Sequence, residues 1–109
     1  MGQVSSDLKE PLEVFRRNVR RRIRVEAVWL FGSRARGDAR PDSDVDLIVV
    51  SPDFRGLDLV ERSRLIRPCW EADISVDILP YTPEEFDRLR QGITLVRTAV
   101  TEGVEVVSG

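Results

Sequence analysis

The chain has 109 residues, 41% of them apolar and 33% charged, with a formal net charge of −2. This length fits one domain with a single core, and the composition excludes a disordered chain. No apolar run approaches the roughly 20 residues of a membrane helix, and residues 1–7 lack the pattern of a secretory signal, so we expect a cytoplasmic protein.

Two absences restrict the chemistry. The sequence contains no histidine and a single cysteine, Cys69. This composition excludes a histidine base, the usual zinc sites and the Ser-His-Asp or Cys-His nucleophiles. Any catalysis must therefore use carboxylates, arginines, hydroxyls, backbone amides and a hard metal ion.

The first predicted element is an amphipathic helix over residues 8–24. Pro11 belongs in a first turn, which places the helix start a few residues after Leu8. One face is arginine-rich, and the seven basic and three acidic side chains of residues 1–24 give a net charge of +4. This face is either solvated or a docking face for nucleic acid or an acidic partner. The opposite, apolar stripe consists of Leu8, Leu12, Phe15, Val19 and Ile23.

Strands and helices are predicted along the rest of the chain. The segment between the first two strands is predicted to be a loop or one short helical turn. The pattern indicates an α/β domain in which helices cover a small sheet. The strands are expected at residues 25–31, 44–50, 74–79 and 104–107, and the later helices at 57–72, from 82 to about 91, and at 93–101.

Proline and capping residues define several of these ends. Pro68 should end the 57–72 helix early, and Pro80 should stop the third strand. Thr82 and Glu85 have the spacing of a capping box, and Gly92 should break the helix that follows.

Three aspartates carry the main chemical signal. Asp44 and Asp46 lie two residues apart on a predicted strand, so they share a face with α-carbons about 6–7 Å apart. Asp77 interrupts an otherwise apolar strand and would complete the same site if the two strands are neighbours. Such acids repel one another, and one or two Mg²⁺ ions would relieve the repulsion and support phosphoryl transfer. The alternatives are solvated acids on an edge strand and, for Asp77, a hydrogen-bonded buried acid.

A glycine turn supplies the complementary half of the pattern. Gly32 permits a sharp turn that brings backbone amides close to a phosphate, and Ser33 adds a hydroxyl donor. Arg34, Arg36 and Arg40 add permanently charged forks for phosphate oxygens, although for Arg34 and Arg40 a solvated or structural role is favoured over a catalytic one. The combination is typical of a nucleoside-triphosphate site, although Gly-Ser also occurs in ordinary turns.

Three short motifs hold these residues: Leu-Phe-Gly-Ser-Arg-Ala-Arg-Gly at 30–37, Ser-Asp-Val-Asp-Leu at 43–47 and Val-Asp-Ile at 76–78. Together they resemble the minimal nucleotidyltransferases of the DNA-polymerase-β superfamily. The resemblance implies one α/β (α+β) domain over residues 1–109, with a small mixed sheet flanked by helices.

The resemblance also implies a role for each site residue. Asp44, Asp46 and Asp77 would be the catalytic carboxylates and would ligate two Mg²⁺ ions. Gly32 and Ser33 would bind the β- and γ-phosphates of the nucleotide, with ATP expected by family habit. Arg36 would stabilise triphosphate or transition-state charge. The reaction would transfer a nucleoside monophosphate to a hydroxyl and release pyrophosphate.

A partner is implied as well. Many short relatives resemble the antitoxin of HEPN/MNT toxin–antitoxin pairs, in which the antitoxin attaches AMP to a tyrosine of the HEPN toxin. The rival hypothesis is a non-catalytic antitoxin that neutralises its partner by contact. A glycosyltransferase with an Asp-x-Asp motif needs a larger fold and is rejected. Direct nucleic-acid binding by the first helix stays open.

Overall fold

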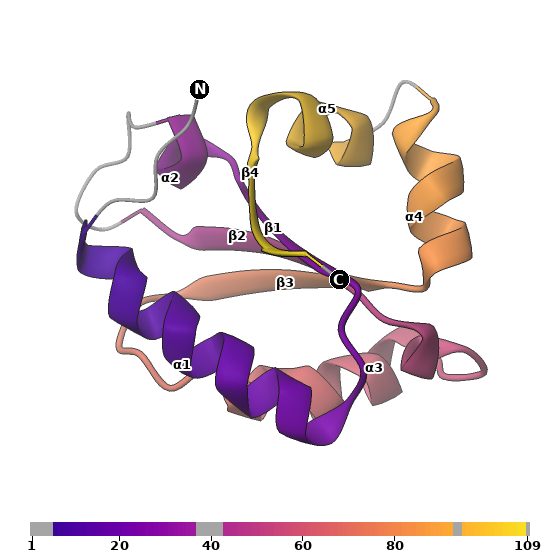
Figure 1. The fold of residues 1–109 in the computed structure, drawn as a ribbon, viewed down its shortest axis with the longest axis horizontal. Helices are drawn as coiled ribbons and strands as arrows, with labels where there is room; N and C mark the ends of the chain where they lie inside the picture. Colours follow the sequence, from indigo (N-terminus) through magenta and orange to yellow (C-terminus); the bar gives the residue numbers. More distant parts are fainter. Residues whose placement is uncertain (1–5, 37–42, 93–94, 109) are drawn as a thin grey trace.

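The computed structural model describes residues 6–36, 43–92 and 95–108. Within them the chain forms a four-stranded mixed sheet with the strand order β3-β2-β1-β4 (Figure 1). β1 is antiparallel to both β2 and β4, whereas β2 and β3 are parallel. The strands are β1 (Ala27–Phe31), β2 (Val45–Val50), β3 (Val76–Tyr81) and β4 (Val104–Ser108).

Helices cover both faces of this sheet, which confirms the predicted fold class. α1 and α3 lie on one face and α4 and α5 on the other (Figure 1). The predicted order of elements is confirmed, with two short 3₁₀ turns added at Pro52–Phe54 and Arg67–Cys69. The helices are α1 (Ser6–Arg22), α2 (Ser33–Arg36), α3 (Leu59–Ile66), α4 (Pro83–Arg90) and α5 (Leu95–Glu102). No helix among the described residues is long and apolar enough to span a membrane.

Alternation along β2 divides the core into two layers. Leu47 and Val49 pack in the cluster beneath α1 and α3, whereas Ile48 and Val50 pack in the cluster beneath α4 and α5. Because side chains on a strand alternate between faces, Asp46 shares the face of Ile48 and Val50. The continuous burial of residues 47–50 on both sides explains why the second half of β2 is apolar throughout.

The apolar stripe of α1 is buried as predicted, but the expected later start was wrong. The helix begins by Ser6, and Pro11 lies inside it. An interior proline costs about 3 kcal/mol through a lost hydrogen bond and steric conflict. Leu8 is fully buried ahead of the proline, and Asp7 pairs with the buried Arg34, so both interactions hold the turn that Pro11 leaves weakened.

The expected end of β3 at Pro80 was also wrong, because the strand continues to Tyr81. β3 is an edge strand, where proline is tolerated if its nitrogen faces away from the neighbouring strand. The Pro80 carbonyl accepts a hydrogen bond from Arg62 at 3.2 Å, on the outer side. The Tyr81 carbonyl points inward and accepts from the Ser51 amide at 3.0 Å.

The predicted helix ends at Pro68 and Thr82 are confirmed. α3 stops at Ile66, before Pro68, and continues as a 3₁₀ turn. α4 begins after Thr82, whose hydroxyl accepts from the Glu85 amide while the Glu85 carboxylate accepts from the Thr82 amide. These two capping bonds orient α4 at the carboxyl end of β3, far from the start of that strand.

Candidate functional site

The predicted site residues gather at one end of the sheet, where β1 ends and β2 and β3 begin. β1 runs antiparallel to β2 and places Phe31 opposite Asp46, so Gly32 follows directly beside that aspartate. β3 runs parallel to β2 and places Asp77 opposite Asp46. Directly paired residues on neighbouring strands share a face, here the α4 and α5 face, with strands about 4.8 Å apart. Asp44 lies two residues earlier, just before β2.

Two features of the structure favour glycine at position 32. Its φ of +76° lies in the left-handed region that favours glycine. A Cβ placed there would also stand 2.5 Å from Oδ2 of Asp46, closer than any real contact. The Gly32 carbonyl then accepts a hydrogen bond from the Ala35 amide at 3.1 Å, which begins α2. The backbone of the turn therefore lies directly against the Asp46 carboxylate.

The three carboxylates form a negatively charged cluster. Asp46 is partly buried, and Asp44 and Asp77 are exposed. Burial raises the pKa of Asp46, and the nearby charges of Asp77 and Asp44 raise it further. In the described part of the chain, none of the three accepts a hydrogen bond from a protein donor or pairs with an arginine. A bound cation would supply the missing counter-charge.

The donor set has the chemistry that Mg²⁺ prefers, which is carboxylate oxygen together with room for water or phosphate. Among the described residues, no group of three or more Asp, Glu, Cys or His side chains converges as a ready ligand set. The side chains of Asp44, Asp46 and Asp77 thus adjoin without converging, and a cation that drew them together would offset their mutual repulsion. The backbone positions and the electrostatics fit a divalent cation.

A buried arginine ties the turn to the strand that carries the acids. Arg34 is only 5% exposed. Its Nε and Nη2 donate to the Ser43 carbonyl at 3.2 and 2.9 Å, and its Nη1 donates to Oδ2 of Asp7 at 3.1 Å. The structural role expected for Arg34 is thus confirmed. Sequence reasoning missed these partners, because nothing in the local pattern links residue 34 to residues 7 and 43.

Comparison with known proteins identifies the family. Residues 12–101 match the model of the nucleotidyltransferase domain. The chain belongs to this nucleotidyltransferase family. It is 33% identical to the Haemophilus influenzae protein named "Probable protein adenylyltransferase MntA", in an alignment covering 83% of this chain and 82% of that protein.

Two solved structures share the nucleotidyltransferase fold. A Sulfolobus solfataricus protein assigned as a nucleotidyltransferase superposes with a TM-score of 0.63 at 23% identity, over 99% of this chain and 92% of the other. A toxin–antitoxin structure with AMP-PNP superposes with a TM-score of 0.63 at 26% identity, over 89% of this chain and 73% of the other.

The remaining predicted site residues lie in or after α2. Ser33 and Arg36 are the first and last residues of this short helix, which begins directly after Gly32. Their side chains, and the whole of Arg40, fall outside the described part of this nucleotidyltransferase. The phosphate-binding roles of Ser33 and Arg36 therefore stay predictions.

Proposed function

We propose that the protein is a Mg²⁺-dependent adenylyltransferase that transfers AMP from ATP to a tyrosine hydroxyl of a HEPN-domain toxin. One observation carries this proposal: Asp46 faces Asp77 across β2 and β3 with the backbone of Gly32 packed against its carboxylate. Family membership supports nucleotidyl transfer, and the name of the Haemophilus influenzae relative supports adenylyl transfer to a protein.

The three aspartates would hold the metal in this mechanism. Asp44, Asp46 and Asp77 would ligate two Mg²⁺ ions, which neutralise phosphate charge and favour the ionised form of the attacking hydroxyl. Their high local charge supports this role, since the raised pKa of Asp46 reflects burial and two neighbouring acids. The chain itself would contribute the carboxylates that fix the geometry of in-line attack on the α-phosphorus.

The glycine turn would hold the other end of the nucleotide. Gly32 and Ser33 would bind the β- and γ-phosphates, and Arg36 would stabilise the charge of the triphosphate or of the departing pyrophosphate. The position of Gly32 against Asp46 supports this assignment, because a triphosphate that bridges metal and turn needs both within a few ångströms. Residues 1–109 would form one minimal nucleotidyltransferase domain.

The toxin would supply the tyrosine hydroxyl that accepts AMP. The comparison structure that contains AMP-PNP is described as a toxin–antitoxin, which supports such a partner. A non-catalytic antitoxin is the second candidate. It is favoured by the exposed apolar side chains of Leu59 and Val60 on α3, which are 63% and 58% exposed and suit contact with another protein.

The decisive experiment uses α-³²P-labelled ATP, GTP, CTP and UTP in turn, with Mg²⁺ and a lysate of the source organism. Wild type, Asp44→Asn/Asp46→Asn and the control Glu84→Gln/Glu85→Gln are compared on a gel. We expect ATP to label one protein band with wild type and control, with at least a 10³-fold loss in the aspartate variant. Mass spectrometry should locate AMP on a tyrosine.

Other outcomes separate the alternatives. A labelled RNA or small molecule would retain the nucleotidyltransferase and contradict the protein acceptor. No transfer by wild type, together with equal retention of a partner by wild type and by the aspartate variant, would contradict catalysis and favour the binding module.

A further inference from the structure

The structure assigns Arg34 a positioning role: its guanidinium sets the distance between the Gly32 turn and the aspartates of β2. This inference rests on the proposed function and adds a residue to it. Among the described residues, Arg34 is the one charged side chain that is buried, at 5% exposure. Burying a guanidinium costs free energy unless its N–H groups donate hydrogen bonds. The groups that accept from Arg34 therefore indicate which parts of the fold its side chain connects.

Arg34 and its partner Ser43 lie at the two ends of the segment that separates the turn from the acids. Arg34 itself is in α2, two residues after Gly32. Its Nε and Nη2 both donate to the carbonyl of Ser43, the residue that immediately precedes Asp44. The fork therefore links the predicted phosphate-binding turn to the first predicted metal ligand, across nine positions of sequence.

The same linkage continues into β3. After Ser43 and Asp44, the Val45 amide donates to the Ser75 carbonyl at 2.8 Å, which begins the parallel ladder that leads to Asp77. On the other side, Nη1 of Arg34 donates to Asp7 near the start of α1. Arg34 is therefore at the junction of the turn, the Asp44–Asp46 segment and the helix layer beneath them.

The guanidinium suits this task better than an ammonium. Its planar fork presents parallel donors to one carbonyl while a third donor reaches a carboxylate, which a lysine ammonium does not reproduce. Displacing reacting groups by about 1 Å costs on the order of 10²-fold in rate. A loss of Arg34 should thus affect metal–nucleotide binding and transfer beyond its effect on stability.

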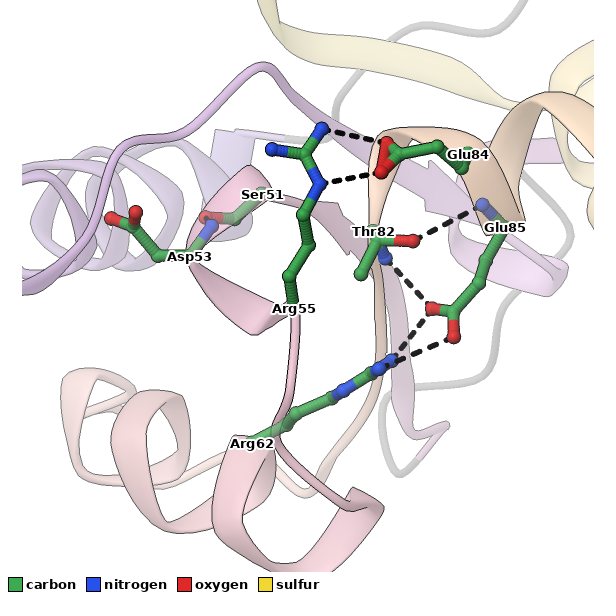
Figure 2. A network of polar contacts seen from close by, with 7 residues as sticks. All are labelled: Ser51, Asp53, Arg55, Arg62, Thr82, Glu84 and Glu85. Carbon is green, nitrogen blue, oxygen red and sulfur yellow. Dashed lines mark hydrogen bonds and ion pairs between the residues drawn. The ribbon is translucent and has the colours of Figure 1, made fainter.

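Arg62 provides a matched control at the other end of the sheet. Its side chain is 13% exposed, and it too donates to backbone carbonyls, Leu57 at 2.9 Å and Pro80 at 3.2 Å, and to a carboxylate, Glu85. Figure 2 shows this arginine reaching Glu85 beside Thr82, at the start of α4. Replacing Arg62 therefore removes the same kinds of bond far from the aspartates.

The test compares wild type, Arg34→Ala, Arg34→Lys and Arg62→Ala. Binding of Mn²⁺ in the presence of α,β-methylene ATP, which cannot transfer AMP, is followed by electron paramagnetic resonance. Thermal midpoints and steady-state transfer rates are measured on the same preparations. We expect both Arg34 variants to need about tenfold more Mn²⁺ and Arg34→Ala to lose on the order of 10²-fold in kcat. Arg62→Ala should lower the thermal midpoint about as much as Arg34→Ala does. Its Mn²⁺ requirement and its kcat should both stay within about twofold of wild type.

The inference is overturned if Arg34→Ala binds Mn²⁺ and nucleotide like wild type, or if Arg62→Ala weakens binding equally. If Arg34→Ala does not fold by circular dichroism, Arg34→Lys decides, and wild-type Mn²⁺ binding in that variant overturns the inference. A wild type that neither binds Mn²⁺ with the nucleotide nor transfers AMP would instead contradict the proposed function. The two failures are therefore distinguishable.

Discussion

The two ends of the sheet contain acidic side chains in opposite electrostatic settings. At the carboxyl end of β3, Glu84 pairs with Arg55 at 2.5 Å and Glu85 pairs with Arg62 at 2.6 Å (Figure 2). Hydrogen bonds from these arginines hold the pKa of both glutamates below the ordinary value. At the opposite end, burial and neighbouring acids raise the pKa of Asp46.

This difference distinguishes acids that stabilise the fold through an arginine partner from acids whose charge is left for a ligand to neutralise. A carboxylate with a guanidinium partner is stabilised within the fold and joins two elements, as Glu85 joins α4 to α3. Carboxylates placed together with no counter-charge from the described residues repel one another, and an external cation would relieve that repulsion. Perturbed acids of the second kind cluster at functional sites.

Among variants that keep all three aspartates, a large effect is expected from adding one methyl group at the acidic end. Gly32→Ala should reduce AMP transfer by on the order of 10²-fold or more. The new Cβ would lie only 2.5 Å from Oδ2 of Asp46, so the carboxylate would have to move away. Gly56→Ala is the control, since Gly56 has a similar φ of +80° but no atom within 4 Å of the point where its Cβ would lie.

Both alanine variants should lose about 1–2 kcal/mol from left-handed strain alone. Chemical denaturation and transfer assays on the two proteins separate strain from displacement of the carboxylate. Equal transfer by both variants would show that the contact between Gly32 and Asp46 is irrelevant to activity.

A smaller effect is expected at the arginine-paired end, as a dependence of stability on pH. Glu85→Gln keeps an acceptor for the capping box and removes the charge that pairs with Arg62. At pH 7 the variant should lose roughly 0.5–1 kcal/mol in the free energy of unfolding, limited by partial exposure of the pair.

The sign follows from the lowered pKa of Glu85. Its contribution is complete above the unfolded value of about 4.5 and is lost as the pH falls through the lower folded value. Urea titrations at pH 7 and pH 3 should therefore show the gap between wild type and variant shrinking in acid. Glu61→Gln is the control. Glu61 has the same capping position in α3 and accepts from the Asp58 amide, as Glu85 accepts from the Thr82 amide, but among the described contacts it has no arginine partner. If the stability difference between wild type and Glu85→Gln widened in acid, the lowered pKa of Glu85 would be contradicted.

Much of this architecture could be predicted from short-range patterns. The period of the α1 stripe, the Thr82–Glu85 capping box and the stop before Pro68 each depend on neighbours within a few residues, and the structure confirms them. Adjacent placement of Asp46 and Asp77 was anticipated only on the condition that their strands are neighbours. The parallel pairing of β2 and β3 meets that condition.

The errors and omissions depend on contacts distant in sequence. Pro80 stays inside β3 because β3 is an edge strand whose outer carbonyl is bonded by Arg62, and a local pattern does not reveal strand order. In α1, the turn before Pro11 is held by Leu8 in the core and by the pair of Asp7 with the distant Arg34, neither of which a local pattern reveals. The partners of Arg34 at residues 7 and 43 likewise become visible only when the helix and strand layers are assembled.

The most direct test of the central claim is the thermal stability of wild type and Asp46→Asn, with and without a metal–nucleotide complex. In EDTA at pH 7, the variant should melt at a higher temperature, because it removes a charge that burial and two acids disfavour. With Mg²⁺ and α,β-methylene ATP at about 100 times the dissociation constant, wild type should gain about 2.7 kcal/mol, and the variant far less, so their order reverses. A variant that is less stable in EDTA, or that gains as much as wild type from the complex, would contradict the assignment of this acidic cluster as a metal–nucleotide site.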